Sequence, residues 1–225
     1  MKKKIFVMGG GGFTRDPHLK LEKYLLSLCE VKNPKIGFLP QASNESRDYI
    51  VKFYQSFLSL GAQPSWISLF GRVEPGWEAE LLNQDIIYVG GGNTRSMLAL
   101  FKEWGVDKVL REAYNRGIIL TGLSAGMICW FKEGVTDSVW PLGTLQGLNL
   151  IESSACPHFD TEPERQDFYI NSVAQGLVSP GYALYDDTGA LFVDGNFEKA
   201  VKTKVGKKVK FIDKDTIKTI ETELL

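Results

Sequence analysis

Five short apolar runs alternate with longer amphipathic segments through the first half of the chain. The apolar runs are Ile5–Met8, Ile36–Leu39, Trp66–Phe70, Ile86–Val89 and Ile118–Thr121. Apolar residues recur at helical spacing in Leu19–Leu28, Tyr49–Leu60 and Ser96–Ala113, with a break expected near Gly105. Runs that are apolar throughout are typical of strands covered on both faces. The pattern predicts an α/β fold, a three-layer sandwich whose central sheet is mostly parallel.

The C-terminal part of the chain has closely spaced strand patterns without helices between them. These patterns are Tyr182–Tyr185, Ala190–Val193, Ala200–Lys204 and Val209–Ile212. Turn residues at Asp187–Gly189, Asp194–Asn196 and Val205–Lys207 separate them and predict antiparallel strands that extend the central sheet. No Pro- or Ser-rich linker and no repeat interrupts residues 1–225, so we expect a single domain.

Composition narrows the class of protein. The chain has 26 Lys and Arg against 27 Asp and Glu, a net charge of -1, which gives no bulk attraction to nucleic acid or anionic lipid. Cys29, Cys129 and Cys156 are an odd number at wide spacing, which disfavours a disulfide framework or a zinc site. The apolar run after Lys2–Lys4 is too short for a secretory signal, and no run approaches a membrane span of about 20 residues. We expect a cytoplasmic protein without nucleic-acid or membrane partners.

Two glycine clusters follow predicted strands. Neither Gly9–Gly12 nor Gly90–Gly92 completes the G-x-G-x-x-G dinucleotide fingerprint, because Thr14 and Arg95 stand at the required third position. For Gly9–Gly12 we expect only a sharp turn at a strand end. The second cluster continues as Asn93-Thr94, and its backbone N–H groups lie at the carboxyl end of a predicted strand. Ligands of open α/β sheets bind at such strand ends, so this loop is a candidate to contact a substrate oxygen.

The pentapeptide Gly122-Leu123-Ser124-Ala125-Gly126 matches the pattern G-x-S-x-G. It follows the apolar run Ile118–Thr121 and precedes the helix-compatible stretch Met127–Phe131, the strand–turn–helix context that a nucleophile elbow requires. Small residues on both sides permit a strained turn that exposes the hydroxyl. We therefore predict that Ser124 is a nucleophile and that the amide of Ala125 faces the developing oxyanion.

A serine hydroxyl needs a general base, and histidine usually supplies it. The chain has two histidines. His18 follows Pro17 at the start of a predicted helix, where an exposed structural position is expected. His158 ends a short β-like run, Ser154–Phe159, that leads into a polar segment. A histidine at one strand end is well placed to meet a serine at another, so we predict His158 as the base.

The third member of such a site is a carboxylate that orients the imidazole. Asp137 lies between Ser124 and His158 in the sequence and follows a glycine, and it is the preferred candidate. Glu133 and Asp160 are alternatives that spacing alone does not exclude. An Asx turn or a helix cap is the structural alternative for Asp137.

Three motifs in order resemble the peptidase E family of aspartyl dipeptidases, whose wider relatives include the cyanophycinases. The motifs are Val89–Thr94, Gly122–Gly126 and Cys156–Phe159, and the similarity extends from Met8–Gly11 to Ala190–Gly195. The resemblance implies a fold like that of class I glutamine amidotransferases. It also implies a Ser-His-Asp/Glu triad that needs no metal or organic cofactor.

Carried over by position, the resemblance makes Ser124 the nucleophile and His158 the base. Asp137 falls close to the acidic member of the family's triad, with Glu133 still open. The oxyanion hole would consist of the amides of Ala125 and Gly92, with Gly91 as the alternative to Gly92.

Substrate specificity is where the chain departs from the family pattern. Aspartyl dipeptidases resemble one another in using an arginine beyond the catalytic histidine to hold the substrate carboxylate. Here that region is shorter, and Arg165 is the nearest candidate. Asp160, Glu162 and Glu164 surround Arg165, so an ion pair with one of them is the structural alternative. Asn93 of the second glycine loop is the other residue expected to bind substrate.

These observations predict a serine peptidase that acts on short peptides. One alternative is a hydrolase of isopeptide or other amide bonds, as in cyanophycinases, or an esterase with the same triad. Another is a non-catalytic module that holds a small anion on the Gly90–Thr94 loop. Trp77 and Trp140 are the candidates for an interface in a homodimer.

Overall fold

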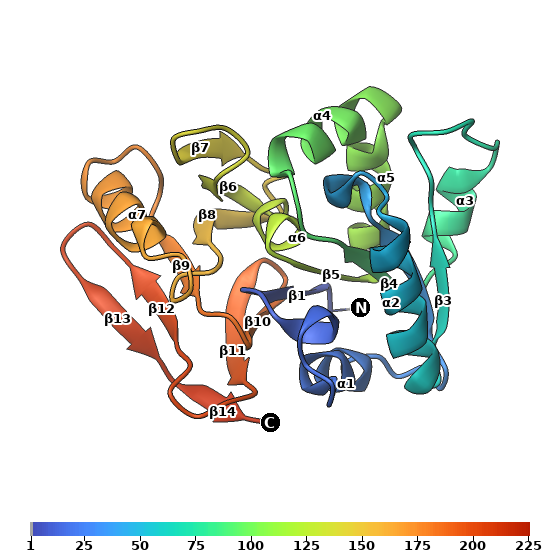
Figure 1. Ribbon diagram of the computed structural model, residues 1–225, viewed down its shortest axis with the longest axis horizontal. Coiled ribbons are helices and arrows are strands. Elements are labelled where there is room, and N and C mark those ends of the chain that lie inside the picture. The colour runs from blue at the N-terminus through green and yellow to red at the C-terminus, as the bar shows by residue number, and fades with distance from the viewer. Residues whose placement is uncertain (1) are drawn as a thin grey trace.

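The structure, a computed structural model that describes residues 2–225, contains two β-sheets with helices packed around them (Figure 1). The strands are β1 (Lys4–Met8), β2 (Lys35–Leu39), β3 (Gln63–Trp66), β4 (Ile86–Val89), β5 (Ile119–Leu123), β6 (Phe131–Thr136), β7 (Gly143–Gln146), β8 (Ile151–Cys156), β9 (Gly181–Leu184), β10 (Thr188–Val193), β11 (Asn196–Lys202), β12 (Val209–Ile212), β13 (Ile217–Ile220) and β14 (Thr222–Leu224). The α-helices are α1 (Lys20–Ser27), α2 (Arg47–Ser59), α3 (Trp77–Leu82), α4 (Thr94–Trp104), α5 (Val106–Arg116), α6 (Ala125–Ile128) and α7 (Glu164–Ala174). Two short 3₁₀ helices, η1 (Gly12–Thr14) and η2 (Gln41–Ser43), follow β1 and β2.

The first sheet has the strand order β14-β11-β10-β1-β5-β4-β2-β3. Its five strands β1, β5, β4, β2 and β3 are parallel, and β10 pairs antiparallel with both β1 and β11. Side chains along β1 alternate between two apolar cores, with Ile5 and Val7 in one and Phe6 and Met8 in the other. The predicted α/β fold with a mostly parallel central sheet is confirmed.

Helices cover both faces of this sheet, which gives the predicted layers (Figure 1). Apolar residues of α1 and α2 pack on one face, and those of α3, α4 and α5 pack on the other. The core beneath α1 and α2, which includes Phe6 and Met8, is rich in aromatic side chains, among them Phe38 and Phe53, whose rings stack with centroids 4.1 Å apart. The long amphipathic stretch does break at Gly105, which has a φ of 72° between α4 and α5.

The second sheet was not predicted. Its order is β13-β12-β9-β8-β6-β7, and α7 lies beside it on the left of Figure 1. The predicted strands Tyr182–Tyr185 and Val209–Ile212 belong to this sheet rather than to the central one, because β9 pairs in parallel with β8 and β12 pairs with β9. Only the strands predicted at Ala190–Val193 and Ala200–Lys204 extend the central sheet, as β10 and β11.

Several element boundaries also differ from expectation. The strand expected at Trp66–Phe70 lies earlier, as β3, and the helix expected over Met127–Phe131 is the short α6, after which Phe131 begins β6. Thr188 and Gly189 belong to β10 and not to a turn. Within residues 2–225, no helix is long and apolar enough to cross a membrane.

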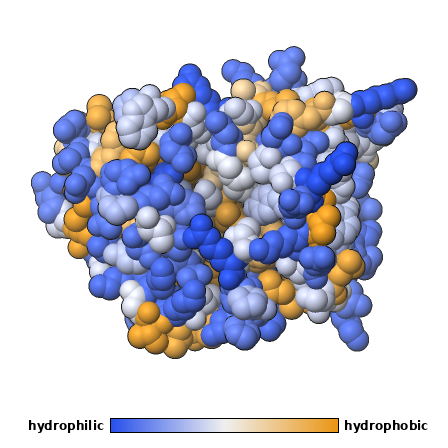
Figure 2. Space-filling view, viewed as in Figure 1, coloured by the Kyte–Doolittle hydropathy of each residue, from blue (hydrophilic) through white to orange (hydrophobic). Residues whose placement is uncertain are grey.

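The two tryptophans singled out from the sequence have different environments. Trp77 is 9% exposed and packs in the core, so it offers no surface for an interface. Trp140 is 93% exposed in the loop between β6 and β7. The face in Figure 2 is largely hydrophilic, with apolar residues in small separate areas. A homodimer stays a prediction.

Candidate active site

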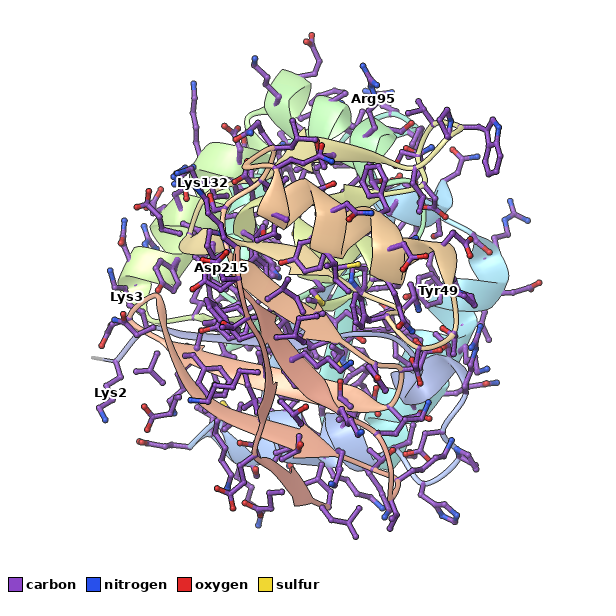
Figure 3. The ribbon with its side chains drawn as sticks, turned by 90° about the vertical axis from the view of Figure 1, so that its left-hand side faces the viewer. Lys2, Lys3, Tyr49, Arg95, Lys132 and Asp215 are labelled. Atoms are coloured by element: carbon purple, nitrogen blue, oxygen red, sulfur yellow. The ribbon has the colours of Figure 1, made fainter. Side chains whose placement is uncertain are left out.

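The loops that follow β1, β4, β5 and β8 meet at the carboxyl ends of the parallel strands. Lys2 and Lys3, which precede β1, lie at the left edge of the molecule in Figure 3, and Tyr49 of α2 lies on the right-hand side. Beside Tyr49 there is an open depression of about 290 Å³ whose lining includes Ser124 and His158. Ligands of open α/β sheets bind at this edge, so the depression is the candidate site.

Ser124 occupies a sharp turn between β5 and α6. Its φ of 55° and ψ of -114° are unusual for a residue with a side chain, and such strain is concentrated at functional sites. A Cβ at Gly126 would overlap the carbonyl oxygen of Val89, and one at Gly122 would overlap the carbonyl oxygen of Gly126. The glycines two residues before and after Ser124 are therefore needed for this turn.

His158 meets Ser124, as the sequence analysis predicted. Its Nε2 lies 2.8 Å from Ser124 Oγ, and its imidazole is only 16% exposed. The backbone N–H of His158 donates to the carbonyl of Gly9 at 3.2 Å, which fixes the residue against the loop after β1. His18 is exposed at the surface, as expected.

The carboxylate that contacts the imidazole is Asp186, which is not among the three carboxylates predicted from the sequence. Asp186 Oδ1 lies 2.7 Å from His158 Nδ1. The preferred candidate, Asp137, lies 3.4 Å from the Arg165 guanidinium instead and is 63% exposed. Asp137 does not occupy the predicted position because it follows β6, a strand of the second sheet. The connection between β9 and β10, which contains Asp186, runs beside His158 instead.

The two alternative carboxylates also have other partners. Glu133 accepts hydrogen bonds from the backbone N–H and the hydroxyl of Ser179. Asp160 uses one carboxylate oxygen to accept the backbone N–H of Asp186 at 2.8 Å and the other to pair with Lys207. The available signal for Asp186 was a pair of acidic residues directly after a predicted strand, at the edge of the sheet where ligands bind.

Asp186 is held in its ionised form. Burial raises the pKa of this carboxyl, but the hydrogen bond from His158 and the charges of the imidazole and of Arg15 outweigh that effect, so the pKa is lowered overall. Arg15 Nη1 lies 3.1 Å from Asp186 Oδ2, and the Thr161 hydroxyl donates to the same oxygen at 3.3 Å. An ionised Asp186 is suited to orient the imidazole and to stabilise its cation.

The glycines after β1 do more than form the expected turn. A Cβ at Gly10 would overlap Asp186 Oδ1 and lie 2.6 Å from two atoms of the His158 ring. The absence of a side chain at Gly10 therefore lets the imidazole and the carboxylate meet. The sequence pattern alone indicated only a turn for this cluster.

We expect Gly10→Ala to lower kcat/KM by about 100-fold or more, because a displacement of about 1 Å at a reacting group has that effect. Gly143→Ala is the matched control, since a Cβ there meets nothing within 4 Å. Steady-state kinetics of both variants, with circular dichroism to confirm folding, checks the prediction. Equal activities in the two variants would contradict the steric role of Gly10.

The predicted oxyanion hole consists of the amides of Ala125 and Gly92, with Gly91 as the alternative to Gly92. The N–H of Gly91 already donates to Tyr49 Oη at 3.2 Å, whereas that of Gly92 meets no acceptor within residues 2–225. Gly92 has a φ of 133°, and a Cβ there would overlap the carbonyl oxygen of Ala42, so the position requires glycine. Ala125 is the first residue of α6, where a backbone N–H has no acceptor inside its own helix. Gly92 and Ala125 are thus better suited than Gly91.

Neither of the predicted substrate-binding side chains is free for that role. The Asn93 carboxamide caps α4 by accepting the Ser96 N–H at 2.8 Å. Arg165 is 2% exposed and forms an ion pair with Glu162, which is the structural alternative that the sequence left open. Arg15 is the charged residue in the lining of the depression, and its side chain is 70% exposed.

Comparisons with known proteins identify relatives of this chain. Residues 5–200 match the model of peptidase family S51. The uncharacterized peptidase YgaJ of Bacillus subtilis (strain 168) is 42% identical over 207 residues, which cover 92% of this chain and 90% of that protein. Peptidase E of Escherichia coli O6:K15:H31 (strain 536 / UPEC) is 32% identical over 115 residues, 50% of this chain and 48% of that protein.

A solved structure shares the fold. The crystal structure of a peptidase from an acI-B1 Actinobacterium superposes with a TM-score of 0.73 at 18% sequence identity, covering 99% of this chain and 95% of that chain. At this level of identity the similarity extends to the fold alone.

Proposed function

This chain belongs to peptidase family S51 and is a serine-type peptidase, and we propose that it hydrolyses short peptides through a triad of Ser124, His158 and Asp186. The observation that carries the proposal is the unbroken line of contacts from Ser124 Oγ to His158 Nε2 at 2.8 Å and from His158 Nδ1 to Asp186 Oδ1 at 2.7 Å. A nucleophile, its base and an orienting acid need this arrangement.

In the proposed reaction His158 removes the Ser124 proton while Oγ attacks the scissile carbonyl carbon. The amides of Gly92 and Ala125 stabilise the tetrahedral oxyanion, and removing one such donor typically raises the barrier by about 2.7–4 kcal/mol. The imidazolium then protonates the leaving amine, which departs and leaves an acyl-enzyme on Ser124. His158 next activates a water molecule that hydrolyses the ester, and Asp186 stabilises the imidazolium in both halves of the reaction.

The dimensions and charge of the depression support a small substrate. Its volume of about 290 Å³ is close to the lower end of the range for small-ligand sites, which is consistent with a short peptide. The Arg15 guanidinium at its edge uses one nitrogen for Asp186 and is otherwise exposed. A cation in this place favours peptides that carry a carboxylate near the scissile bond.

Substrate profiling tests the proposed activity. The purified chain is assayed against dipeptides and tripeptides, isopeptides linked through side-chain carboxyls, and aryl esters, with Ser124→Ala as the blank for each. We expect hydrolysis of α-peptide bonds, fastest in peptides of two or three residues. Hydrolysis of isopeptides with no turnover of α-peptides would favour the cyanophycinase-type alternative, and binding without turnover in any class would favour the non-catalytic alternative.

A further inference from the structure

We propose that the turn Thr203–Lys208, which lies beyond the family-matched residues 5–200, is a positioning element for Asp186 and that Lys207 sets the charge around it. This inference rests on the proposed function, because it assigns a role to residues that act through the triad. The turn connects β11 of the central sheet to β12 of the second sheet, so it brings a C-terminal segment to the site.

The residues on each side of Asp186 are hydrogen-bonded to this turn. The N–H of Tyr185 donates to the carbonyl of Lys208 at 3.2 Å, and the N–H of Thr203 donates to the carbonyl of Asp187 at 2.9 Å. Asp186 thus lies between two backbone contacts with the same turn.

Asp186 itself is connected to the turn through Asp160. Asp160 Oδ1 accepts the Asp186 N–H at 2.8 Å, and Asp160 Oδ2 forms an ion pair with Lys207 Nζ. The side chains of Asp160 and Lys207 are only 17% and 21% exposed, so solvent screens their pairing less than that of a surface pair. Lys207 therefore holds the acceptor that fixes the backbone of Asp186.

Ion pairs connect charged side chains in and around Asp186 and this turn, and Asp16 also acts on the charge of Lys204. The carboxylates are Asp160, Asp186 and Asp187, and the cations are Arg15, Lys204 and Lys207. Loss of the Lys207 charge makes this group of side chains more negative by one unit, and a more negative surrounding stabilises the protonated imidazole of His158. The neutral imidazole is the form that activates Ser124, so the active form would then require a higher pH.

The experiment measures the rate at which a fluorophosphonate labels Ser124 between pH 5 and pH 9, and it needs no knowledge of the substrate. We expect Lys207→Met to move the midpoint of the acidic limb upward by about 0.5 pH unit and Asp160→Asn to move it downward by a similar amount. Lys207→Arg should keep the wild-type midpoint. The double variant Asp160→Asn with Lys207→Met should return to it, because both charges are gone.

Lys199→Met is the matched control, because Lys199 forms its ion pair with Glu223 on β14, outside the groups that surround His158. A midpoint that stays at the wild-type value in Lys207→Met and in Asp160→Asn would overturn the inference, as would an equal upward shift in Lys199→Met. If Lys207→Met does not fold, the midpoint in Asp160→Asn alone tests the inference: a downward shift supports it, and an upward shift or none overturns it. Failure of the wild-type chain to react with the fluorophosphonate would instead count against the proposed function.

Discussion

Replacement of Ser124 or of His158 by Ala should each lower kcat by about 10⁴- to 10⁶-fold, and the double replacement should lower it little further. The two residues act as one unit, because the 2.8 Å contact between Oγ and Nε2 is the path of the proton that makes the hydroxyl nucleophilic. Once either side chain is absent, the other no longer contributes to catalysis, so its replacement lowers kcat little further. The remaining rate would come from substrate binding and from the amides of Gly92 and Ala125.

Single-turnover and steady-state kinetics of the three variants, with the substrate found by profiling, check this non-additivity. Thermal unfolding curves serve as the control for folding. His18→Ala is the matched control for the loss of a histidine, since His18 is exposed and its contact with Asp16 is made by its backbone N–H. Losses that multiply in the double variant would show that the two side chains act independently.

Asp186→Asn should lower kcat by about 10⁴-fold, while Asp137→Asn should leave it within a few-fold of the wild type. An amide in place of the carboxylate at Asp186 removes the negative charge that stabilises the imidazolium and can favour the wrong tautomer of His158. Asp137 is 63% exposed and pairs with Arg165, whereas the Nδ1 atom of His158 is taken by Asp186.

These two substitutions also test which carboxylate orients His158: Asp186, which contacts it in the structure, or Asp137, which the sequence spacing favoured. Kinetics of both variants under the same conditions suffices as the measurement, with a pH profile to confirm that the Asp186 variant is impaired across the range. A large loss of activity in Asp137→Asn together with a small loss in Asp186→Asn would support Asp137 as the acid of the triad.

The parts of the site that could be predicted depend on local sequence. The turn at Ser124 requires glycines at 122 and 126 because backbone atoms approach within van der Waals contact there, and that requirement is visible as G-x-S-x-G. The contact between His158 and Ser124 could be anticipated because both follow strands whose ends meet at one edge of the fold. The central parallel sheet was predictable for a similar reason, since its strands are apolar on both faces.

The acid could not be placed in the same way. Its position depends on which sheet each C-terminal strand joins, and that is decided by pairings such as β8 with β9 that leave no pattern in the local sequence. Because the second sheet was not predicted, Asp137 was assigned to the site and Asp186 was overlooked. The role of Gly10 was missed for the same reason, since a close approach to Asp186 becomes visible only when Asp186 is in place.

Covalent labelling is the most direct test that Ser124 is a nucleophile and that His158 activates it. The wild-type chain and His158→Ala are incubated with a fluorophosphonate at pH 7.5, digested and analysed by mass spectrometry. We expect the mass of the phosphonyl group to appear on the peptide that contains Ser124 in the wild type. In His158→Ala we expect the rate of this labelling to fall by at least about 1,000-fold. Labelling at another serine, or equal labelling of Ser124 in both proteins, would contradict these expectations.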